Sequence, residues 1–149
     1  MIVDGQRGDL ERLLALIREF GGIDFPEGRR AGIERPIDWS QILVVAPYNA
    51  QVAKLAHRLG QPGRVGTVDK FQGREAAVSL YSLTTSSADL APRGMDFLYS
   101  ANRLNVATSR ARALAIVVGN PALLDVVAHS PTQMRLANAL CRLVEVAAP

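Results

Sequence analysis

The sequence predicts an α/β domain whose mostly parallel β-sheet is covered by helices on both faces. Short, continuously apolar runs alternate along the chain with stretches whose apolar residues recur at helical spacing. The run at 42–46, Ile-Leu-Val-Val-Ala, shows no alternation of polar and apolar side chains, which is typical of a strand buried on both faces. Strands of this kind that are connected through helices form parallel sheets.

The first 36 residues are expected to be a helix followed by a connection. Asp9 is a candidate cap, and Gly21-Gly22 ends the helical pattern. The apolar residues between them share one helix face: Leu10, Leu13, Leu14, Ile17 and Phe20. Residues 21–36 contain four glycines, two prolines and three arginines, a composition that indicates a surface connection. The main domain is therefore expected over residues 37–149.

Strand and helix patterns alternate from residue 37 onward. An apolar stripe at helical spacing follows the first strand and is closed by Gly60; its members are Val52, Leu55, Ala56 and Leu59. Further strands are predicted at 64–68, 77–83 and 114–118. Each of these runs is apolar enough to be buried within the same sheet.

Two helices are predicted after the last strand. Asn120-Pro121 provides a cap and a proline at the first helical position. Ser130 is followed three residues later by Gln133, which together indicate a capping box for the final helix. The apolar stripe of that helix consists of Leu136, Leu140, Leu143, Val144 and Ala147.

Length and composition exclude several classes of protein. A chain of 149 residues with a net charge of +3 is a single mildly basic domain. Its only lysines, Lys54 and Lys70, neither follow a glycine nor precede Ser or Thr, so the chain contains no Walker A loop. The single Cys141 excludes an internal disulfide and a cysteine-based zinc site. No segment is long and apolar enough to cross a membrane, and we expect a cytoplasmic protein that has no membrane partner and binds no metal itself.

Clustered polar residues lie next to the predicted strands. Ligands of parallel sheets bind beyond the carboxyl ends of the strands, so we expect functional residues there. Residues 47–51 follow the first strand, and residues 69–75 follow the second. A third polar segment, 102–112, precedes the last strand and contains Arg103, Arg110 and Arg112.

The residues alone leave alternative roles open. An arginine such as Arg110 suits a phosphoryl group because its planar fork pairs two oxygens, yet an arginine-rich helix is also an ordinary solvated surface. Glu75 either accepts hydrogen bonds from a ribose or is a surface carboxylate. Thr67 and Asp69 either contact a phosphate and a base or cap the following turn. Tyr48 either stacks on a base or packs in the core.

The three segments taken together resemble superfamily 1 helicases. The stretch Thr-Val-Asp-Lys-Phe-Gln-Gly-Arg-Glu at 67–75 resembles motif V of the branch with the RNA-surveillance helicases and replication-associated nuclease-helicases. Residues 102–112 resemble motif VI of that branch, and residues 46–51 resemble its Pro-Tyr segment. The Gly-Asn-Pro at 119–121 also fits the branch. The resemblance covers about residues 40–127 and extends to bacterial proteins that fuse such a helicase to a RecB-like nuclease.

The resemblance implies that this chain is the second of two RecA-like domains, a P-loop-NTPase-type fold without the P-loop. ATP with Mg²⁺ would bind between the domains, and the Mg²⁺ ligands are expected on the first. Arg110 would be the catalytic arginine finger on the γ-phosphate. The other nucleotide contacts would be Gln72, Gly73, Arg74 and Glu75, with Glu75 at the ribose. Single-stranded DNA or RNA would lie along Pro47, Tyr48, Asn49, Thr67, Val68, Asp69 and Lys70.

The sequence also departs from the family. Motifs I to IV are not found, so the resemblance implies a partner P-loop domain, either in the same longer chain or in trans. The chain is then a segment of a longer helicase or the remnant of one, and by itself would not hydrolyse ATP. The alternative is a non-catalytic nucleic-acid-binding or interaction module that has kept the helicase fold without the motor. Residues 86–96 offer no function that can be argued from their types.

Overall fold

A computed structural model describes residues 15, 24–26, 34–85, 91 and 93–147. The helix predicted over residues 10–20 lies almost entirely outside the described residues. Within the segment expected to be a connection, β1 (Asp24–Pro26) and β2 (Glu34–Pro36) form a small antiparallel pair. The expectation of a plain connection over residues 21–36 therefore missed two short strands.

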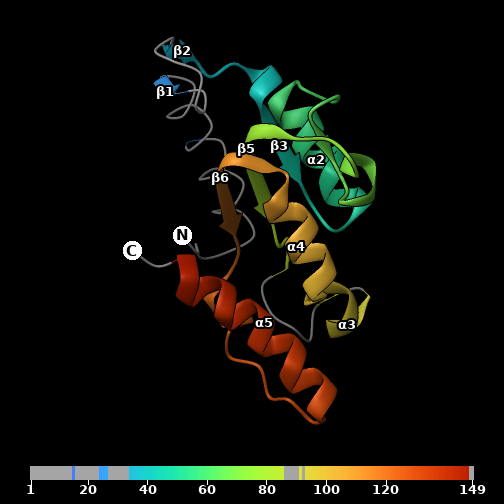
Figure 1. Cartoon of the computed structure of the whole chain (residues 1–149). Helices are drawn as coiled ribbons and strands as arrows, with labels where there is room; N and C mark the ends of the chain where they lie inside the picture. The colour runs from blue at the N-terminus through green and yellow to red at the C-terminus, as the bar shows by residue number, and fades with distance from the viewer. Residues whose placement is uncertain (1–14, 16–23, 27–33, 86–90, 92, 148–149) are drawn as a thin grey trace.

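The main sheet contains four parallel strands (Figure 1). In spatial order they are β4 (Val65–Gly66), β3 (Ile42–Val45), β5 (Ala76–Ser82) and β6 (Ala111–Val118). In the register of the sheet, Leu80 of β5 lies between Val44 of β3 and Ile116 of β6. The predicted parallel α/β fold is confirmed.

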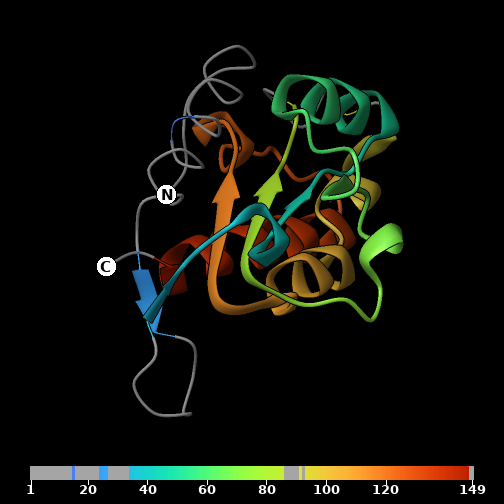
Figure 2. The same ribbon diagram turned by 90° about the horizontal axis from the view of Figure 1, so that it is seen from above.

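Helices cover both faces of this sheet (Figure 2). The α-helices are α2 (Asn49–Leu59), α3 (Gly94–Leu98), α4 (Ala101–Ser109) and α5 (Pro131–Ala147). Single 3₁₀ turns are η1 (Trp39–Gln41), η2 (Asp69–Phe71) and η3 (Pro121–Leu123). Leu55 of α2 packs with one buried face of the sheet, and Leu104 of α4 and Leu140 of α5 pack with the other.

Local signals explain where the helices begin and end. Gly60 ends α2 in the left-handed conformation, at a φ of 63° that glycine adopts without strain. At the start of α5, the Gln133 main-chain N–H donates to the Ser130 hydroxyl (3.2 Å). The Gln133 side chain in turn accepts from the His129 N–H (2.8 Å), a variant of the predicted capping box.

Two predicted elements are shorter than expected. The strand predicted at 64–68 is paired only at Val65 and Gly66, because Val68 adopts helical backbone angles that start η2. Asn120 caps a helical start as predicted, its side chain accepting from the Ala122 N–H, but only the single turn η3 follows. Of the stripe predicted for α5, Leu140 is buried and Ala147 is exposed.

Two buried tyrosines on the α4 side of the sheet differ in how their hydroxyls are satisfied. Tyr99 donates to the Leu123 carbonyl oxygen at 2.8 Å and so joins α3 to η3. The Tyr81 hydroxyl makes no hydrogen bond with any residue that the structure describes. A buried polar group without a partner costs free energy, whereas a satisfied one stabilises the fold.

We therefore predict opposite outcomes for the same chemical change at the two sites. Tyr99→Phe leaves the Leu123 carbonyl without this donor and should lower the free energy of unfolding by about 1–3 kcal/mol. Tyr81→Phe removes an unsatisfied hydroxyl and should leave stability unchanged or slightly higher. Urea unfolding at pH 7 measures both values, and equal losses in the two variants would contradict the assignment.

Candidate functional site

The residues that sequence analysis selected fall into two groups at opposite ends of the sheet. The segments around residues 47–49 and 67–70 follow the carboxyl ends of β3 and β4. Residues 72–75 and Arg110 directly precede the amino ends of β5 and β6. Since all four strands are parallel, these two sets of strand ends lie on opposite edges. The second group therefore lies at the edge opposite to the carboxyl ends, where the sequence pattern led us to expect functional residues.

The amino-end group brings two distant sequence segments into contact. The main-chain N–H of Ala76 donates to the Arg110 carbonyl oxygen at 3.0 Å. This bond brings Glu75, the residue before Ala76, close to Arg110. Glu75 is exposed to solvent. Gly73 has a φ of 77°, a conformation that favours glycine, and the space where a Cβ would stand is open. Gln72 and Arg74 are exposed beside it.

The Arg110 side chain is folded back against the end of its own helix. Its Nε donates to the Val106 carbonyl oxygen at 3.1 Å, and its Nη2 donates to the Ser109 hydroxyl at 3.2 Å. The neighbouring Arg112 points elsewhere and donates to the Gln41 side chain at 2.9 Å. Arg110 caps the end of α4 whereas Arg112 belongs to β6, and their side chains have different partners.

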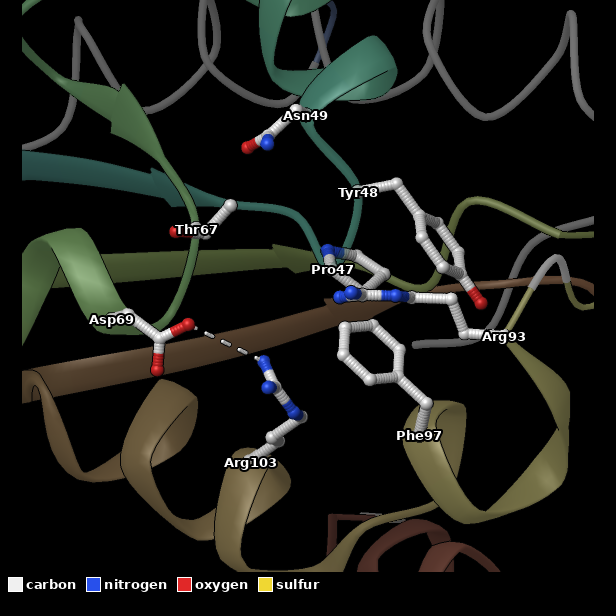
Figure 3. A pocket seen from close by; sticks show the side chains of 8 residues that line it. All are labelled: Pro47, Tyr48, Asn49, Thr67, Asp69, Arg93, Phe97 and Arg103. Carbon is white, nitrogen blue, oxygen red and sulfur yellow. Dashed lines mark ion pairs between the residues drawn. The ribbon is translucent and has the colours of Figure 1, made fainter.

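The carboxyl-end group surrounds a cavity of about 310 Å³ (Figure 3). Pro47, Tyr48 and Asn49 reach it from the turn between β3 and α2, and Thr67 and Asp69 reach it from the turn after β4. The remaining lining residues are Arg93 and Phe97 from the region of α3 and Arg103 from α4. Segments far apart in the sequence thus meet at one space.

Phe97 is the centre of this cavity wall. The Tyr48 ring stacks on it with a centroid separation of 5.5 Å and an angle of 26°. The Arg93 and Arg103 guanidinium carbons lie 4.6 Å and 4.0 Å from the same ring centroid. Contacts at this distance between a cation and an aromatic face are attractive. Arg103 is also 3.7 Å from the Asp69 carboxylate, whose side chain is 78% exposed.

Two residues of the predicted nucleic-acid segment turn away from the cavity. The Val68 side chain is 5% exposed and packs in the core. The Lys70 ammonium donates to the carbonyl oxygens of Val65 (2.7 Å) and Pro62 (3.1 Å). The stem of Lys70 lies so close to Gly66 that a Cβ there would stand 2.4 Å from the lysine Cδ. In this structure Lys70 therefore fastens its own turn.

Sequence reasoning missed Arg93 and Phe97 as lining residues. Arg93 comes from residues 86–96, for which no function was predicted, and Phe97 follows that segment directly. Arg103 was named only as part of the polar segment at 102–112. An Arg followed four residues later by Phe is an ordinary pattern at helical spacing, and only the path of the chain brings it to Tyr48. No signal in the residue types alone distinguishes this pair.

Comparison with known proteins gives the family. Residues 27–122 match the AAA domain family, AAA_12. The chain belongs to this family. The predicted resemblance to superfamily 1 helicases is also confirmed, since the curated relatives of this AAA domain are helicases. The family match and the parallel sheet together show a helicase-type RecA-like fold.

The relatives are similar over more than half of this AAA-domain chain. The probable RNA helicase armi of Drosophila melanogaster is 39% identical over 94 residues, which is 58% of this chain and 8% of that protein. The DNA polymerase alpha-associated DNA helicase A of Schizosaccharomyces pombe is 40% identical over 91 residues, 59% of this chain and 13% of that protein. A regulator of nonsense transcripts 1 homolog of Arabidopsis thaliana is 36% identical over 96 residues, which is 58% of this chain and 7% of that protein. The chain thus spans a small part of each relative.

The described part of the AAA domain contains neither a metal-binding cluster nor a membrane-spanning helix. Among the described residues, no group of three or more His, Cys, Asp or Glu side chains could hold a metal ion. No helix in the described part of the chain is both long enough and apolar enough to span a bilayer.

Burial changes the acid–base behaviour of two tyrosines near the cavity of this AAA domain. Burial raises the pKa of Tyr81 to about 12, an effect that the positive charge of Arg103 opposes and that Tyr48 reinforces. Burial likewise raises the pKa of Tyr48 above its ordinary value, opposed by contacts with Arg93. Both hydroxyls therefore remain neutral at physiological pH.

The Tyr81 shift predicts a loss of stability at alkaline pH. Tyr81 ionises near pH 10 in the unfolded chain and near pH 12 in the folded one, so between these values the unfolded state binds fewer protons and stability falls as pH rises. A difference of about two pKa units corresponds to at most about 3 kcal/mol. Urea unfolding at pH 8 and pH 11.5 should show a smaller loss for Tyr81→Phe than for the wild type. An identical loss would contradict the prediction.

Proposed function

We propose that the chain is the second RecA-like domain of an ATP-dependent helicase and works together with a P-loop domain. Arg110 is the arginine finger, and ATP with Mg²⁺ occupies the cleft that the P-loop domain completes. The observation that carries this proposal is the hydrogen bond between Ala76 and Arg110 at the amino edge of the sheet. It joins the segment resembling motif V to the segment resembling motif VI at one place, as a shared nucleotide site requires.

The geometry of Arg110 supports the role of a finger. Among the residues that the structure describes, the acceptors for its guanidinium group are two neutral oxygen atoms, those of Val106 and Ser109. A charged phosphate oxygen is a stronger acceptor for a guanidinium than a carbonyl or a hydroxyl, so a γ-phosphate would draw the side chain away from the helix. Gln72, Gly73, Arg74 and Glu75 then face the same nucleotide, with Glu75 at the ribose.

The opposite edge of the sheet supports a single-strand track. Pro47, Tyr48, Asn49, Thr67 and Asp69 line the cavity described above. In this proposal Val68 contributes its main chain, since its side chain is buried, and Lys70 acts by holding the turn. Helix α4 runs between the two edges, because it starts beside the cavity and ends at Arg110. Closure of the cleft between this domain and the P-loop domain would thereby affect the bound single strand of nucleic acid.

A non-catalytic binding module is the second candidate function. It is favoured by the cavity, whose described lining residues all belong to this chain, whereas the proposed nucleotide site requires a P-loop domain as well. The two candidates differ in whether Arg110 affects turnover once a P-loop domain is present.

We predict that the isolated 149-residue chain hydrolyses ATP only at background rate, because neither of its two lysines lies in a P-loop that could bind the β/γ-phosphates. When it is joined to a P-loop RecA-like domain, Arg110→Ala should lower the rate of single-strand-stimulated hydrolysis by on the order of 10³-fold, with a much smaller change in ATP affinity. Phosphate release and binding of a fluorescent ATP analogue measure the two quantities.

Arg135→Ala serves as the matched control, since Arg135 is an exposed arginine on α5, outside both groups of residues. It should leave turnover unchanged. Robust hydrolysis by the isolated chain would contradict the two-domain proposal. Equal rates for Arg110→Ala and Arg135→Ala would favour the non-catalytic module.

A further inference from the structure

Two arginines share one aromatic ring in the carboxyl-edge cavity. The guanidinium carbons of Arg93 and Arg103 lie 4.6 Å and 4.0 Å from the Phe97 ring centroid (Figure 3). Because both distances are measured to the same centroid, the two guanidinium carbons lie at most about 9 Å apart. Two like charges this close repel each other, and a ring quadrupole offsets only part of that repulsion.

The acidic groups near the cavity do not balance the two charges. Asp69 is the one carboxylate among the described residues that line it, and it contacts Arg103 at 3.7 Å. Among the residues that the structure describes, no carboxylate forms an ion pair with Arg93. The lining therefore carries two positive charges and one negative charge. An anion with a single charge would neutralise it.

Neutral donors complete the lining. Thr67, which has a hydroxyl group, and Asn49, which has a side-chain amide, both line the cavity. Asn49 is also the first residue of the 11-residue helix α2, whose N-terminal turn has no side-chain cap from Tyr48. Hydroxyl, amide and guanidinium groups are donors that phosphate oxygens accept from.

We propose that Arg93 and Arg103, positioned by Phe97, bind one internal phosphodiester of a single-stranded nucleic acid in this cavity. The inference rests on the proposed function and adds to it Arg93 and Phe97, which lie outside the three segments that resemble helicase motifs. A phosphodiester carries one negative charge, which matches the net charge of the lining. Arg103 is paired with Asp69, so Arg93 supplies the positive charge that the phosphate neutralises.

Phe97 is a positioning residue in this scheme. Stacking on a ring restricts each guanidinium to one plane while leaving its N–H groups available at the edges. Restricting the side chains before binding reduces the entropy lost when the phosphate is bound. Leucine at this position would keep apolar volume but would remove the ring that aligns the two cations.

The test uses the 149-residue chain and fluorescence-labelled single strands of oligothymidylate and oligouridylate, with dissociation constants measured from 50 to 300 mM salt. Arg93→Ala should weaken binding of both strands by about tenfold at low salt, the effect expected for one charge-assisted contact. It should also reduce the magnitude of the slope of log K against log salt by about 0.7, the value for one phosphate contact on a single strand.

Three comparisons sharpen the result. Arg135→Ala removes an exposed arginine that does not line the cavity and should leave the slope unchanged. Phe97→Leu should weaken binding several-fold with the slope retained, because both charges remain. An oligothymidylate with uncharged methylphosphonate linkages should bind the wild type more weakly than the ordinary oligothymidylate does. The difference in affinity between the two strands should be smaller for Arg93→Ala than for the wild type. Circular dichroism of each variant confirms that the fold is retained.

The outcomes separate the inference from the proposed function. Wild-type binding that Arg93→Ala and Arg135→Ala reduce equally would overturn the phosphodiester site and leave the helicase-domain proposal intact. A loss confined to one of the two strands would assign the contact to the sugar or base, which also overturns it. No binding of either strand by the wild type would overturn the single-strand track itself, and with it this inference.

Discussion

The parallel pairing of β5 between β3 and β6 is the constraint on which the rest of the structure depends. Each neighbour runs in the same direction, so all strand beginnings lie at one edge and all strand ends at the other. A parallel sheet has to be buried on both faces, which requires α2 on one side and α4 and α5 on the other. Only the two edges of the sheet remain for exposed chemistry.

Helix α4 connects those edges. Its first turn places Arg103 against Phe97 and Asp69, and its last residues place Arg110 at the start of β6. The helix is anchored to the sheet by a buried hydrogen bond from the Ser79 hydroxyl to the Ala107 carbonyl oxygen (2.8 Å). One helix thereby carries residues of both groups. This arrangement fits a domain that couples a nucleotide site to a nucleic-acid track.

The sequence predicted the fold better than it predicted the site. Continuous apolar runs located the strands at 42–46, 77–83 and 114–118 close to their observed positions, because a strand buried on both faces leaves little choice of residue. The second strand was overestimated, since Val68 is apolar enough for a strand but its backbone turns into η2 to bury the side chain. The lining roles of Arg93 and Phe97 were not predicted, because their spacing is ordinary.

The sequence by itself determined the alternation of strands and helices, the absence of a Walker lysine and the helicase resemblance, since these depend on residue type and local order. Only the tertiary structure decided which polar residues lie together. It placed Gly73, Glu75 and Arg110 at one edge and Tyr48, Thr67 and Arg103 at the other. The physical reason is that strand direction and helix packing decide which ends of the elements meet, and neither is written in the spacing of any single segment.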